Sequence, residues 1–378
     1  MKNFGIVLLV SERSGSNLLR SLLGNHSQIT APVAPHLLAE FYNMSKYYGD
    51  LRDPININTL VKEMISLANH PYHNWGLSEN NILHSEISEL PSSVVSAMDF
   101  IYKFKAKQEN KSCYCSKGIE SFKFIDQIRA EVPSIKFVHL VRDPRDHVAS
   151  WLNKPLHLFT ALDAILKWKE EQEIFINAIQ RKALNCISVK YEDLISDPAF
   201  IISKILNFLE LPVEDQCFNT ETEKNETLMW NPYWKNLSKP IMNENMGKYN
   251  NELSDEEINI IETVARCEME YFDYKPISKQ NWIYDNISKA RLIAQKTERE
   301  KTSNIKPFIE LQSKMDFIKT LKDQRIKEWY EQNKEFSWIP IKFNNEITKS
   351  NFKKRIKYLS FALIGEIKTK KLINSIWK

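Results

Sequence analysis

A polar loop near the N-terminus carries side chains that suit an anion. The loop reads SERSGSN, residues 11–17, and it lies between an apolar run, residues 4–10, and a leucine-rich helical pattern. Small residues let the backbone approach an oxyanion, and the N–H groups that open the helix point outward with the positive end of its dipole. We therefore predict an anion site in this loop. Its members would be Arg13, Ser14, Gly15, Ser16 and Asn17.

A second polar segment, RDPRDHVAS, follows another apolar run at residues 135–141. Asp143 is suited to cap the next helix, and Pro144 is suited to its first turn. Arg142 stands at the end of a predicted strand and Ser150 lies eight residues later, so the two are placed to hold one phosphate together. The alternative interpretation is that Arg142 and Asp143 pair only with neighbouring charges.

The first loop lacks the ending of an ATP or GTP site. Such a loop reads G-x-x-x-x-G-K-[ST], with the lysine on the β- and γ-phosphates and the hydroxyl on magnesium. Here Ser16 follows Gly15, and no lysine comes after it. A nucleotide kinase is therefore a poor fit, although it remains an alternative, as does an ordinary strand-to-helix turn.

Apolar runs and helical patterns alternate along the first part of the chain. Buried strands are predicted at 4–10, 112–117, 135–141 and 185–194, the last running into a turn. Helices are predicted at 16–24, 58–69, 92–108, 119–132 and 160–182, whereas the prolines of 31–41 predict a loop. This alternation predicts an α/β fold of three layers, a central parallel sheet flanked by helices on both faces. Ligands bind such folds beyond the carboxyl ends of the strands.

Charge is distributed unevenly along the 378 residues. A hydrophobic content of 43% and a charged content of 26% are ordinary for a soluble globular protein. Residues 276–378 hold 23 Lys/Arg and 11 Asp/Glu, a net charge of +12, whereas residues 1–275 hold 29 and 37, a net charge of −8. We therefore predict a main domain at 1–275 and a basic, mostly helical C-terminal extension at 276–378, with helices near 285–303 and 308–335.

The five cysteines show no spacing typical of metal ligands, and most lie in apolar surroundings. They indicate reduced thiols in a reducing compartment, so we expect a cytoplasmic protein. No apolar run approaches 18 residues, and no small-residue cleavage site follows the run 4–10. A buried first strand therefore explains the N-terminus better than a signal segment does.

Four segments together resemble the sulfotransferases that use 3′-phosphoadenosine 5′-phosphosulfate (PAPS), in particular their bacterial and Golgi carbohydrate branch. VSERSGSNLLRSLL resembles the 5′-phosphosulfate loop, and LVRDPRDHVASW resembles the 3′-phosphate motif with its separation of eight between Arg and Ser. VKYEDLISDP, residues 189–198, and residues 234–262 resemble later segments of the family. The resemblance covers about residues 4–274. It implies a P-loop-like fold and an enzyme that transfers a sulfuryl group from PAPS to a hydroxyl.

The resemblance also implies how the donor is bound. Arg13 and the rest of the first loop would hold the 5′-phosphosulfate, while Arg142 and Ser150 would hold the 3′-phosphate. Lys239 and Lys248 would reach the 3′-phosphate from a C-terminal loop, although the Arg-Lys-Gly triplet of the cytosolic enzymes is absent there. By analogy with phosphoryl transfer, the protein mainly positions the reactants and stabilises charge, and no metal is expected.

The residues expected at the reacting centre include Lys117, which would stabilise charge on the bridging oxygen. An acceptor hydroxyl also needs a general base. Cytosolic relatives carry a histidine two residues after the strand lysine, but here that position is Ile119. We favour His36 as the base, with Glu40 as the alternative, because relatives often place a base in this segment and an imidazole titrates near neutral pH. A weaker candidate pair is His84 and Glu86.

The acceptor is less defined by the sequence. Family analogy favours a carbohydrate hydroxyl. Six residues belong either to a sugar platform or to the core or an interface: Tyr42, Tyr47, Tyr48, Tyr72, His73 and Trp75. The last residues, 351–378, interleave basic and apolar side chains, which is typical of a membrane-surface segment or of an ordinary basic helix. No nucleic-acid-binding motif accompanies this charge. A catalytically inactive PAPS- or bisphosphate-binding protein anchored at a membrane surface remains an alternative to the enzyme.

Overall fold

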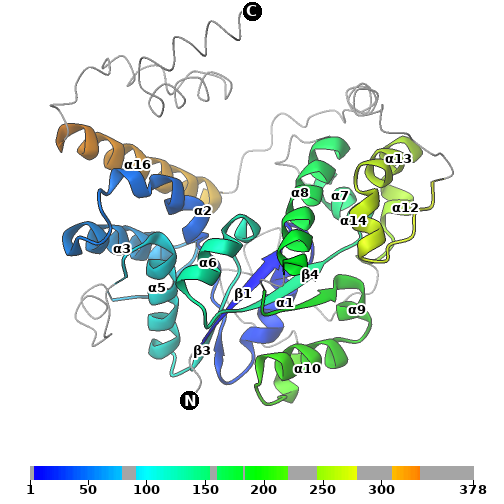
Figure 1. Ribbon diagram of the computed structural model, residues 1–378, viewed down its shortest axis with the longest axis horizontal. Helices are drawn as coiled ribbons and strands as arrows, with labels where there is room; N and C mark the ends of the chain where they lie inside the picture. Colours follow the sequence, from blue (N-terminus) through cyan, green and yellow to red (C-terminus); the bar gives the residue numbers. More distant parts are fainter. Residues whose placement is uncertain are drawn as a thin grey trace, which may run out of the picture. The chain divides into compact units, whose positions relative to one another are not determined.

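The computed structural model describes residues 4–78, 91–153, 160–181, 184–219, 245–278 and 309–332. Its centre is a five-stranded sheet with the strand order β2-β3-β1-β4-β5 (Figure 1). The strands are β1 (Phe4–Val10), β2 (Ile29–Thr30), β3 (Cys113–Ser116), β4 (Lys136–Val141) and β5 (Cys186–Lys190). Every pairing is parallel, and β1 lies between β3 and β4.

The side chains of the sheet alternate between two helical layers. Ile6 and Leu8 of β1 belong to a core cluster with α1 (Ser16–Gly24), α9 (Tyr191–Ser196) and α10 (Pro198–Leu209). On the other face, Tyr114 of β3 packs against α5 (Val94–Gln108), and His139 of β4 stacks on Phe175 of α8 (Ala161–Gln180). Helices cover both faces (Figure 1), so the predicted three-layer, P-loop-like fold is confirmed.

The remaining elements begin where their sequences provide caps. Asp143 accepts a hydrogen bond from the Arg145 N–H at 2.9 Å and thereby caps α7 (Pro144–Leu152), with Pro144 in the first turn as predicted. Thr160 and Asp163 form a reciprocal capping box at the start of α8. The other described helices are α2 (Leu37–Phe41), α3 (Pro54–Asn69), α6 (Ile125–Glu131), α7 (Pro144–Leu152), α12 (Tyr249–Glu252), α13 (Asp255–Val264), α14 (Arg266–Tyr271) and α16 (Ile309–Gln332), with the 3-10 turns η1 (Tyr42–Tyr47), η2 (Ser121–Phe124) and η3 (Asp215–Phe218).

Two predicted elements differ from those observed. The predicted helix at 119–132 begins with the 3-10 turn η2 and becomes α6 only at Ile125, after Glu120 adopts a left-handed backbone with φ of 62°. The predicted loop at 31–41 ends in the short helix α2, because no proline follows Pro35 to block it. The second difference sets the directions of His36 and Glu40.

His139 is a structural residue of the sheet. Its ring nitrogens bond to Ser188 of β5 at 2.8 Å and to Gln172 of α8 at 3.0 Å, and burial lowers its pKa to about 3. The amide of Gln172 also donates to the hydroxyl of Ser11 at 3.1 Å. A buried polar network therefore connects the middle of the sheet to the first residue of the polar loop.

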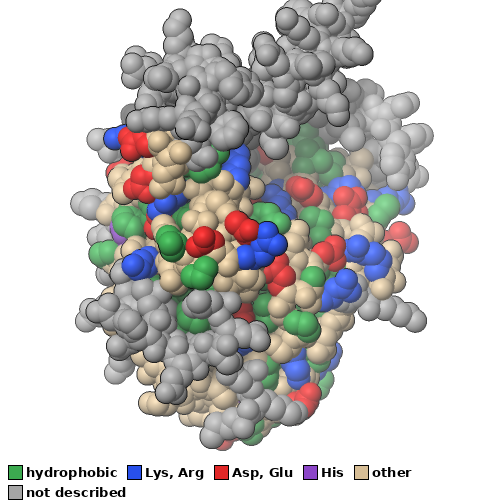
Figure 2. Space-filling view, turned by 60° about the vertical axis from the view of Figure 1, so that its left-hand side comes forward, with side chains coloured by type: hydrophobic (Ala, Val, Ile, Leu, Met, Phe, Trp, Pro, Cys, Tyr) green, Lys and Arg blue, Asp and Glu red, His purple; other side chains and the backbone are tan. Residues whose placement is uncertain are grey.

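Contacts divide the chain into two units, Met1–Arg325 and Ile326–Lys378. The larger unit includes the first part of α16, which the sequence assigns to the basic extension, and the boundary near residue 276 stays a prediction. α16 holds five basic and five acidic residues, so its own net charge is zero. On the face shown in Figure 2, side chains of both charges are likewise interspersed.

None of the five cysteines forms a disulfide bond, and of the five only Cys267 is exposed. Within the described ranges, no helix combines the length and the apolar character that a bilayer span requires. The residues 351–378 lie outside these ranges. Membrane-surface contact and a cytoplasmic location therefore stay predictions.

Candidate active site

The loop after β1 turns sharply at Gly15, which precedes α1. Gly15 has φ of 85°, a left-handed conformation that side chains rarely adopt, and a Cβ atom there would lie 2.3 Å from the ring of Tyr191. The ring of Tyr191 therefore packs directly against the loop backbone. The first N–H groups of α1 have no partners within the helix, so this turn offers them to a bound anion.

The polar side chains of the loop point in different directions. Ser14 is fully buried, and its hydroxyl donates to the carbonyl of Ser11 at 2.6 Å, so it stabilises the turn and contributes only its backbone to an anion site. Ser16 opens α1 and is also buried. Asn17 points the other way, and its Oδ1 accepts a hydrogen bond from the Nζ of Lys117 at 3.0 Å. The loop is thereby tied to the end of β3.

Arg13, Arg142 and Ser150, three of the predicted donor-site residues, meet beside this loop. The Nε of Arg13 donates to the hydroxyl of Ser150 at 3.1 Å, and Nη1 of Arg142 donates to the backbone carbonyl of Arg13 at 2.9 Å. The guanidinium of Arg142 also lies over the ring of Tyr191, at 4.7 Å from its centroid. Its buried Nε has no hydrogen-bond partner among the described residues, so it is available to a ligand.

A C-terminal loop reaches the same place. Nη2 of Arg142 donates to the carbonyl of Asn245 at 2.6 Å. The carboxylate of Asp146, on α7, accepts hydrogen bonds from the N–H groups of Gly247 at 2.7 Å and Tyr249 at 3.0 Å. Lys248 stands between these two residues and is half-buried at the start of α12. Lys239 lies outside the described residues, so its role stays a prediction.

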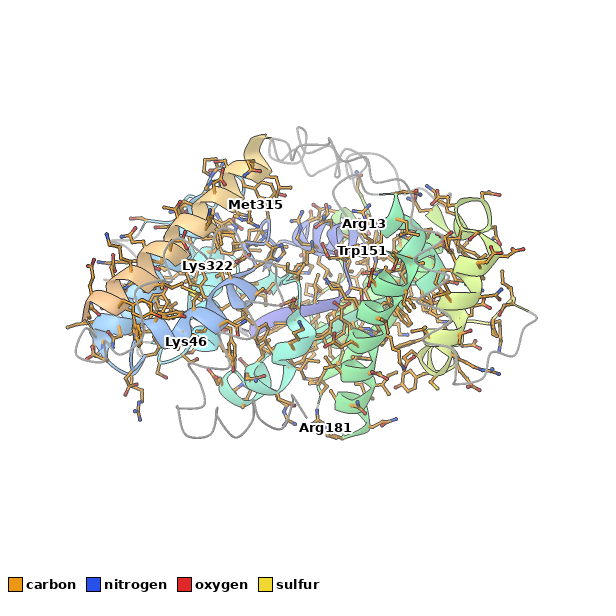
Figure 3. The ribbon with its side chains drawn as sticks, turned by 90° about the horizontal axis from the view of Figure 1, so that it is seen from above. Arg13, Lys46, Trp151, Arg181, Met315 and Lys322 are labelled. Atoms are coloured by element: carbon orange, nitrogen blue, oxygen red, sulfur yellow. The ribbon has the colours of Figure 1, made fainter. Side chains whose placement is uncertain are left out.

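Trp151 completes this edge of the site. In Figure 3 it lies beside Arg13, and its indole N–H donates to the carbonyl of Glu12 at 3.3 Å. Lys167 of α8 lies over the Trp151 ring and pairs with the Glu12 side chain at 3.4 Å. Glu12 is thus held through its backbone from α7 and through its side chain from α8.

His36 contacts Ile119, the position at which cytosolic relatives carry a histidine. Its Nδ1 accepts a hydrogen bond from the backbone N–H of Ile119 at 3.1 Å. Burial, followed by the charges of Lys314 and Lys117, holds the pKa of His36 well below its ordinary value, so the ring is neutral near pH 7. A neutral ring that accepts at Nδ1 carries its proton on Nε2, so in this structure that nitrogen is a donor.

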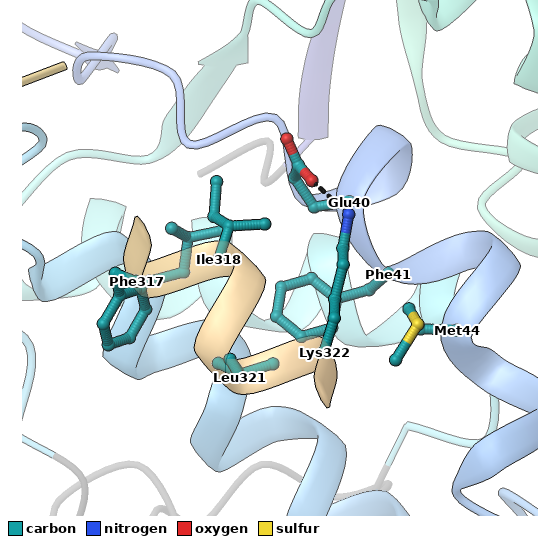
Figure 4. Close-up of a pocket in the computed structure, with 8 residues that line it drawn as sticks. Glu40, Phe41, Met44, Phe317, Ile318, Leu321 and Lys322 are labelled. Carbon is teal, nitrogen blue, oxygen red and sulfur yellow. Dashed lines mark hydrogen bonds and ion pairs between the residues drawn. The ribbon is translucent and has the colours of Figure 1, made fainter. Parts of the chain in front are cut away.

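Glu40, the alternative base, turns away from His36. Its Oε2 pairs with the Nζ of Lys322 on α16 at 2.7 Å (Figure 4). The two predicted bases are one helical turn apart, as their spacing implies, but their functional groups have different partners. The pair His84 and Glu86 lies outside the described residues.

A mostly apolar pocket lies beside His36. It is small and lies between α2, α5 and the end of β3. Its apolar lining includes Leu37, Leu38 and Met98, while Ser116 and Ser121 are among its few polar groups. An acceptor that entered here would reach His36 and the strand end that carries Lys117.

The aromatic side chains between 48 and 75 belong mainly to the core. Trp75 is 2% exposed, donates to the carbonyl of Val33 at 2.8 Å, and meets the edge of Tyr102 at 4.8 Å between ring centroids. Tyr48 is 4% exposed and bonds to Glu63 at 2.5 Å. Neither ring is available to stack on a sugar.

Two residues of the site were not identified from the sequence. Tyr191 was quoted only as part of VKYEDLISDP, and its packing on Gly15 and Arg142 depends on where β5 ends. Asp146 lies within the segment RDPRDHVAS, whose sequence does not indicate that its carboxylate binds the C-terminal loop. Among the described residues, no three His, Cys, Asp or Glu side chains gather as metal ligands.

Comparison with known proteins agrees with this geometry. A model described as the sulfotransferase family matches residues 6–215. Protein-tyrosine sulfotransferase 1 of Danio rerio is 24% identical over 221 residues, which cover 55% of this chain and 54% of that protein. A Caenorhabditis elegans protein that is provisionally named a protein-tyrosine sulfotransferase is 32% identical over 107 residues, which cover 27% of this chain and 41% of that protein. The chain thus spans about half or less of the length of these two relatives.

Among solved structures, the fold is similar to the sulfotransferase domain of the olefin synthase from Synechococcus PCC 7002. The TM-score is 0.51 at 19% identity, and the match covers 73% of this chain and 97% of that domain. At this identity the likeness concerns the fold alone.

Proposed function

This chain belongs to the sulfotransferase family, and we propose that it transfers the sulfuryl group of PAPS to an acceptor hydroxyl. The observation that supports this most is the meeting of Arg13, Arg142 and Ser150. A 3′-phosphate needs charge-assisted donors that ordinary adenine nucleotides would leave unused, and the unpartnered Nε of Arg142 is one such donor. The loop and the first N–H groups of α1 would hold the 5′-phosphosulfate.

In the proposed reaction, an S–O bond forms between the acceptor oxygen and sulfur while the bond from sulfur to the bridging phosphate oxygen breaks. Adenosine 3′,5′-bisphosphate leaves, and the acceptor gives up its hydroxyl proton. Lys117, held by Asn17 at 3.0 Å, would stabilise the negative charge that develops on the bridging oxygen. No metal is assigned a part in this scheme.

We propose a tyrosine phenol as the acceptor, in place of the carbohydrate hydroxyl that family analogy favours. The named curated relatives are protein-tyrosine sulfotransferases. The pocket beside His36 is mostly apolar, and a sugar that entered it would lose hydrogen bonds between its hydroxyls and water. A phenol presents one hydroxyl to such a lining and needs only one polar partner.

The proton acceptor is either His36 or Glu40, and each would need a change of partner. To accept a proton at Nε2, His36 would have to carry its own proton on Nδ1 and lose the hydrogen bond that Nδ1 accepts from Ile119. Its lowered pKa also makes it a weak base. Glu40 would have to leave Lys322. In its observed state, His36 is better suited to donate a hydrogen bond from Nε2.

The donor site is tested by calorimetric titration with adenosine 3′,5′-bisphosphate in the absence of magnesium, with AMP and ATP as comparison ligands. We expect the bisphosphate to bind more tightly than AMP. Arg142→Ala should weaken bisphosphate binding about 10- to 100-fold, as for a lost charge-assisted hydrogen bond, and leave AMP binding nearly unchanged.

Arg181→Ala is a matched control. It removes an exposed arginine at the C-terminal end of α8, and this end of the helix lies away from Arg13 (Figure 3). It should change neither affinity. Equal affinity of the wild type for the bisphosphate and AMP would refute the PAPS site. Release of bisphosphate from PAPS in the presence of a tyrosine acceptor then distinguishes an enzyme from an inactive binding protein.

A further inference from the structure

A carboxyl group of α8 is buried next to the polar loop that follows β1. Glu171 is 6% exposed, and its Oε2 has no hydrogen-bond partner among the described residues. Ser11, the first residue of the loop, is 1% exposed and acts on the Glu171 carboxyl as a hydrogen-bond donor. Buried polar atoms normally have hydrogen-bond partners, so Glu171 lacks a donor at one of its two oxygens.

A chain of hydrogen bonds with one direction ends at this carboxyl group. Neutral His139 accepts at Nδ1 from the hydroxyl of Ser188, at 2.8 Å, and donates from Nε2 to the side-chain oxygen of Gln172, at 3.0 Å. The amide of Gln172 donates to the Ser11 hydroxyl at 3.1 Å. Because the Ser11 oxygen accepts this bond, its own proton is left for Glu171. The network therefore supplies Glu171 with one donor and leaves Oε2 without one.

Burial raises the pKa of Glu171 to about 7, so near neutral pH both of its protonation states are populated. The charged groups that act on it come from three elements. Lys167, one turn earlier on α8, favours the ionised form, Glu12 of the polar loop opposes it, and Lys123 of η2 favours it. Lys167 is itself paired with Glu12 at 3.4 Å and lies over the ring of Trp151. The attraction of two lysines thus does not offset the burial of the carboxylate.

The polar loop connects this carboxyl group to the proposed donor site. Ser11 and Glu12 directly precede Arg13, which bonds to Ser150 at 3.1 Å. The carbonyl of Ser11 also accepts the hydroxyl of Ser14 at 2.6 Å. A change in the hydrogen bond of the Ser11 side chain would therefore act on the turn that offers its N–H groups to an anion. A negative charge on Glu171 would also repel a bound anion, since buried charges are screened less than charges in water.

We propose that Glu171 is a positioning residue for the polar loop, which favours donor binding when its carboxyl group is protonated and opposes it when the group is ionised. The proposal rests on the proposed function, in which this loop holds the 5′-phosphosulfate. Protonation removes the buried charge, and the carboxyl O–H then donates to the Ser11 oxygen. The bond between α8 and Ser11 is kept with donor and acceptor exchanged, and the Ser11 proton becomes free for another acceptor.

The test is the pH dependence of bisphosphate affinity in the full-length protein. Adenosine 3′,5′-bisphosphate is titrated calorimetrically, from pH 6 to pH 8, into the wild type and into Glu171→Gln, which keeps the size of the side chain and removes its charge. Ionisation of the bisphosphate is common to both proteins and cancels in the ratio of their affinities. We expect this ratio, wild type over variant, to fall about three- to tenfold from pH 6 to pH 8, as for a pKa that rises by about half to one unit on binding.

Proton uptake provides a second readout. At pH 7, titrations in two buffers of different ionisation enthalpy should show that the wild type takes up about 0.3 proton more than Glu171→Gln when the bisphosphate binds. A purely structural role of Glu171 would change the affinity without changing the number of protons.

Two further variants locate the effect. Ser11→Ala removes a hydrogen bond that favours the ionised form of Glu171, so it should move the midpoint of the pH dependence to a higher pH. Glu170→Gln removes an exposed charge from the adjacent position of α8 and should keep the wild-type profile.

Parallel pH profiles of the wild type and Glu171→Gln would overturn the proposal, as would equal proton uptake by the two proteins. An equal change of the profile in Glu170→Gln would also overturn it. Each of these results leaves the proposed function in place if the bisphosphate still binds more tightly than AMP. Failure of the wild type to bind the bisphosphate at any of these pH values would overturn both proposals.

Discussion

The proposed donor side and the proposed acceptor side of this molecule are built in different ways. On the donor side, Arg13 and Arg142 follow two adjacent parallel strands, and the register of Val10 with Leu140 brings the two loops together. On the acceptor side, His36, His73 and Lys314 come from a short helix, a turn and α16, segments that no strand pairing aligns. Residues at the ends of the sheet are therefore suited to a donor shared by a whole family, and the more distant elements are suited to acceptor choice.

The largest effect that we expect concerns the donor side. Gly15→Ala should destabilise the fold by about 2–4 kcal/mol, since it adds the cost of a left-handed backbone to a methyl group placed 2.3 Å from the Tyr191 ring. Bisphosphate binding should weaken together with stability. Chemical denaturation and calorimetry measure the two effects.

Gly76→Ala provides the matched control. Gly76 also has positive φ, 62°, but a Cβ atom there would meet nothing within 4 Å. Only the backbone cost of about 1 kcal/mol should appear, with unchanged bisphosphate affinity. Equal losses of stability in the two variants would mean that the contact with Tyr191 does not add to the cost of Gly15→Ala. The contrast between the two sides would then lose one of its supports.

An effect that is smaller for each pH unit should appear in acid at the buried network beneath the polar loop. The pKa of His139 is about 3 in the fold and about 6.5 in an unfolded chain, so between these values the unfolded state binds one more proton. His139 should therefore lower the free energy of unfolding by about 1.4 kcal/mol for each pH unit below about 6, with its full contribution retained above 6.5.

His139→Phe keeps a ring that can stack on Phe175 and removes the titrating group. We expect a lower overall stability but a shallower slope of the free energy of unfolding between pH 6 and 4. His36 and His73, whose pKa values are also lowered, act in the same direction and keep part of the slope. An unchanged slope in His139→Phe would contradict the assignment.

The smallest effect concerns the acceptor side. His36→Gln keeps a side-chain donor near the position of Nε2 and cannot act as a base. Because Nδ1 accepts from Ile119 in this structure, we expect kcat to fall by less than about tenfold. A fall of about 10²- to 10⁴-fold would identify His36 as the proton acceptor after all. Glu40→Gln, measured beside it, tests the alternative base.

The sequence predicted the elements around the two polar loops well, for a physical reason. The apolar run at 4–10 and the leucine pattern at 16–24 correspond to β1 and α1, and Asp143 caps α7 as its position implies. These features depend on local patterns and caps. Their meeting then follows from a parallel sheet, whose strand ends share one edge.

The acceptor side depends on contacts that local patterns do not encode. His36 bonds to Ile119, 83 positions away, and Ser313 bonds to His70, 243 positions away. Prolines indicated a loop around residue 36 but not the left-handed backbone that directs the His36 ring. The net charge of residues 276–378 led us to predict a basic extension that includes Lys314. The burial of Lys314 against Tyr72 instead follows from how α16 packs.

The packing of α16 also limits how the protein can be divided for experiments. A fragment cut at the charge boundary, after residue 275, would keep every described donor-site residue. It would uncover Phe41 and Met44 and remove the ammonium group beside Tyr72. Such a truncated protein would be expected to bind bisphosphate yet aggregate through the exposed apolar surface, and its acceptor profile would not represent that of the full chain.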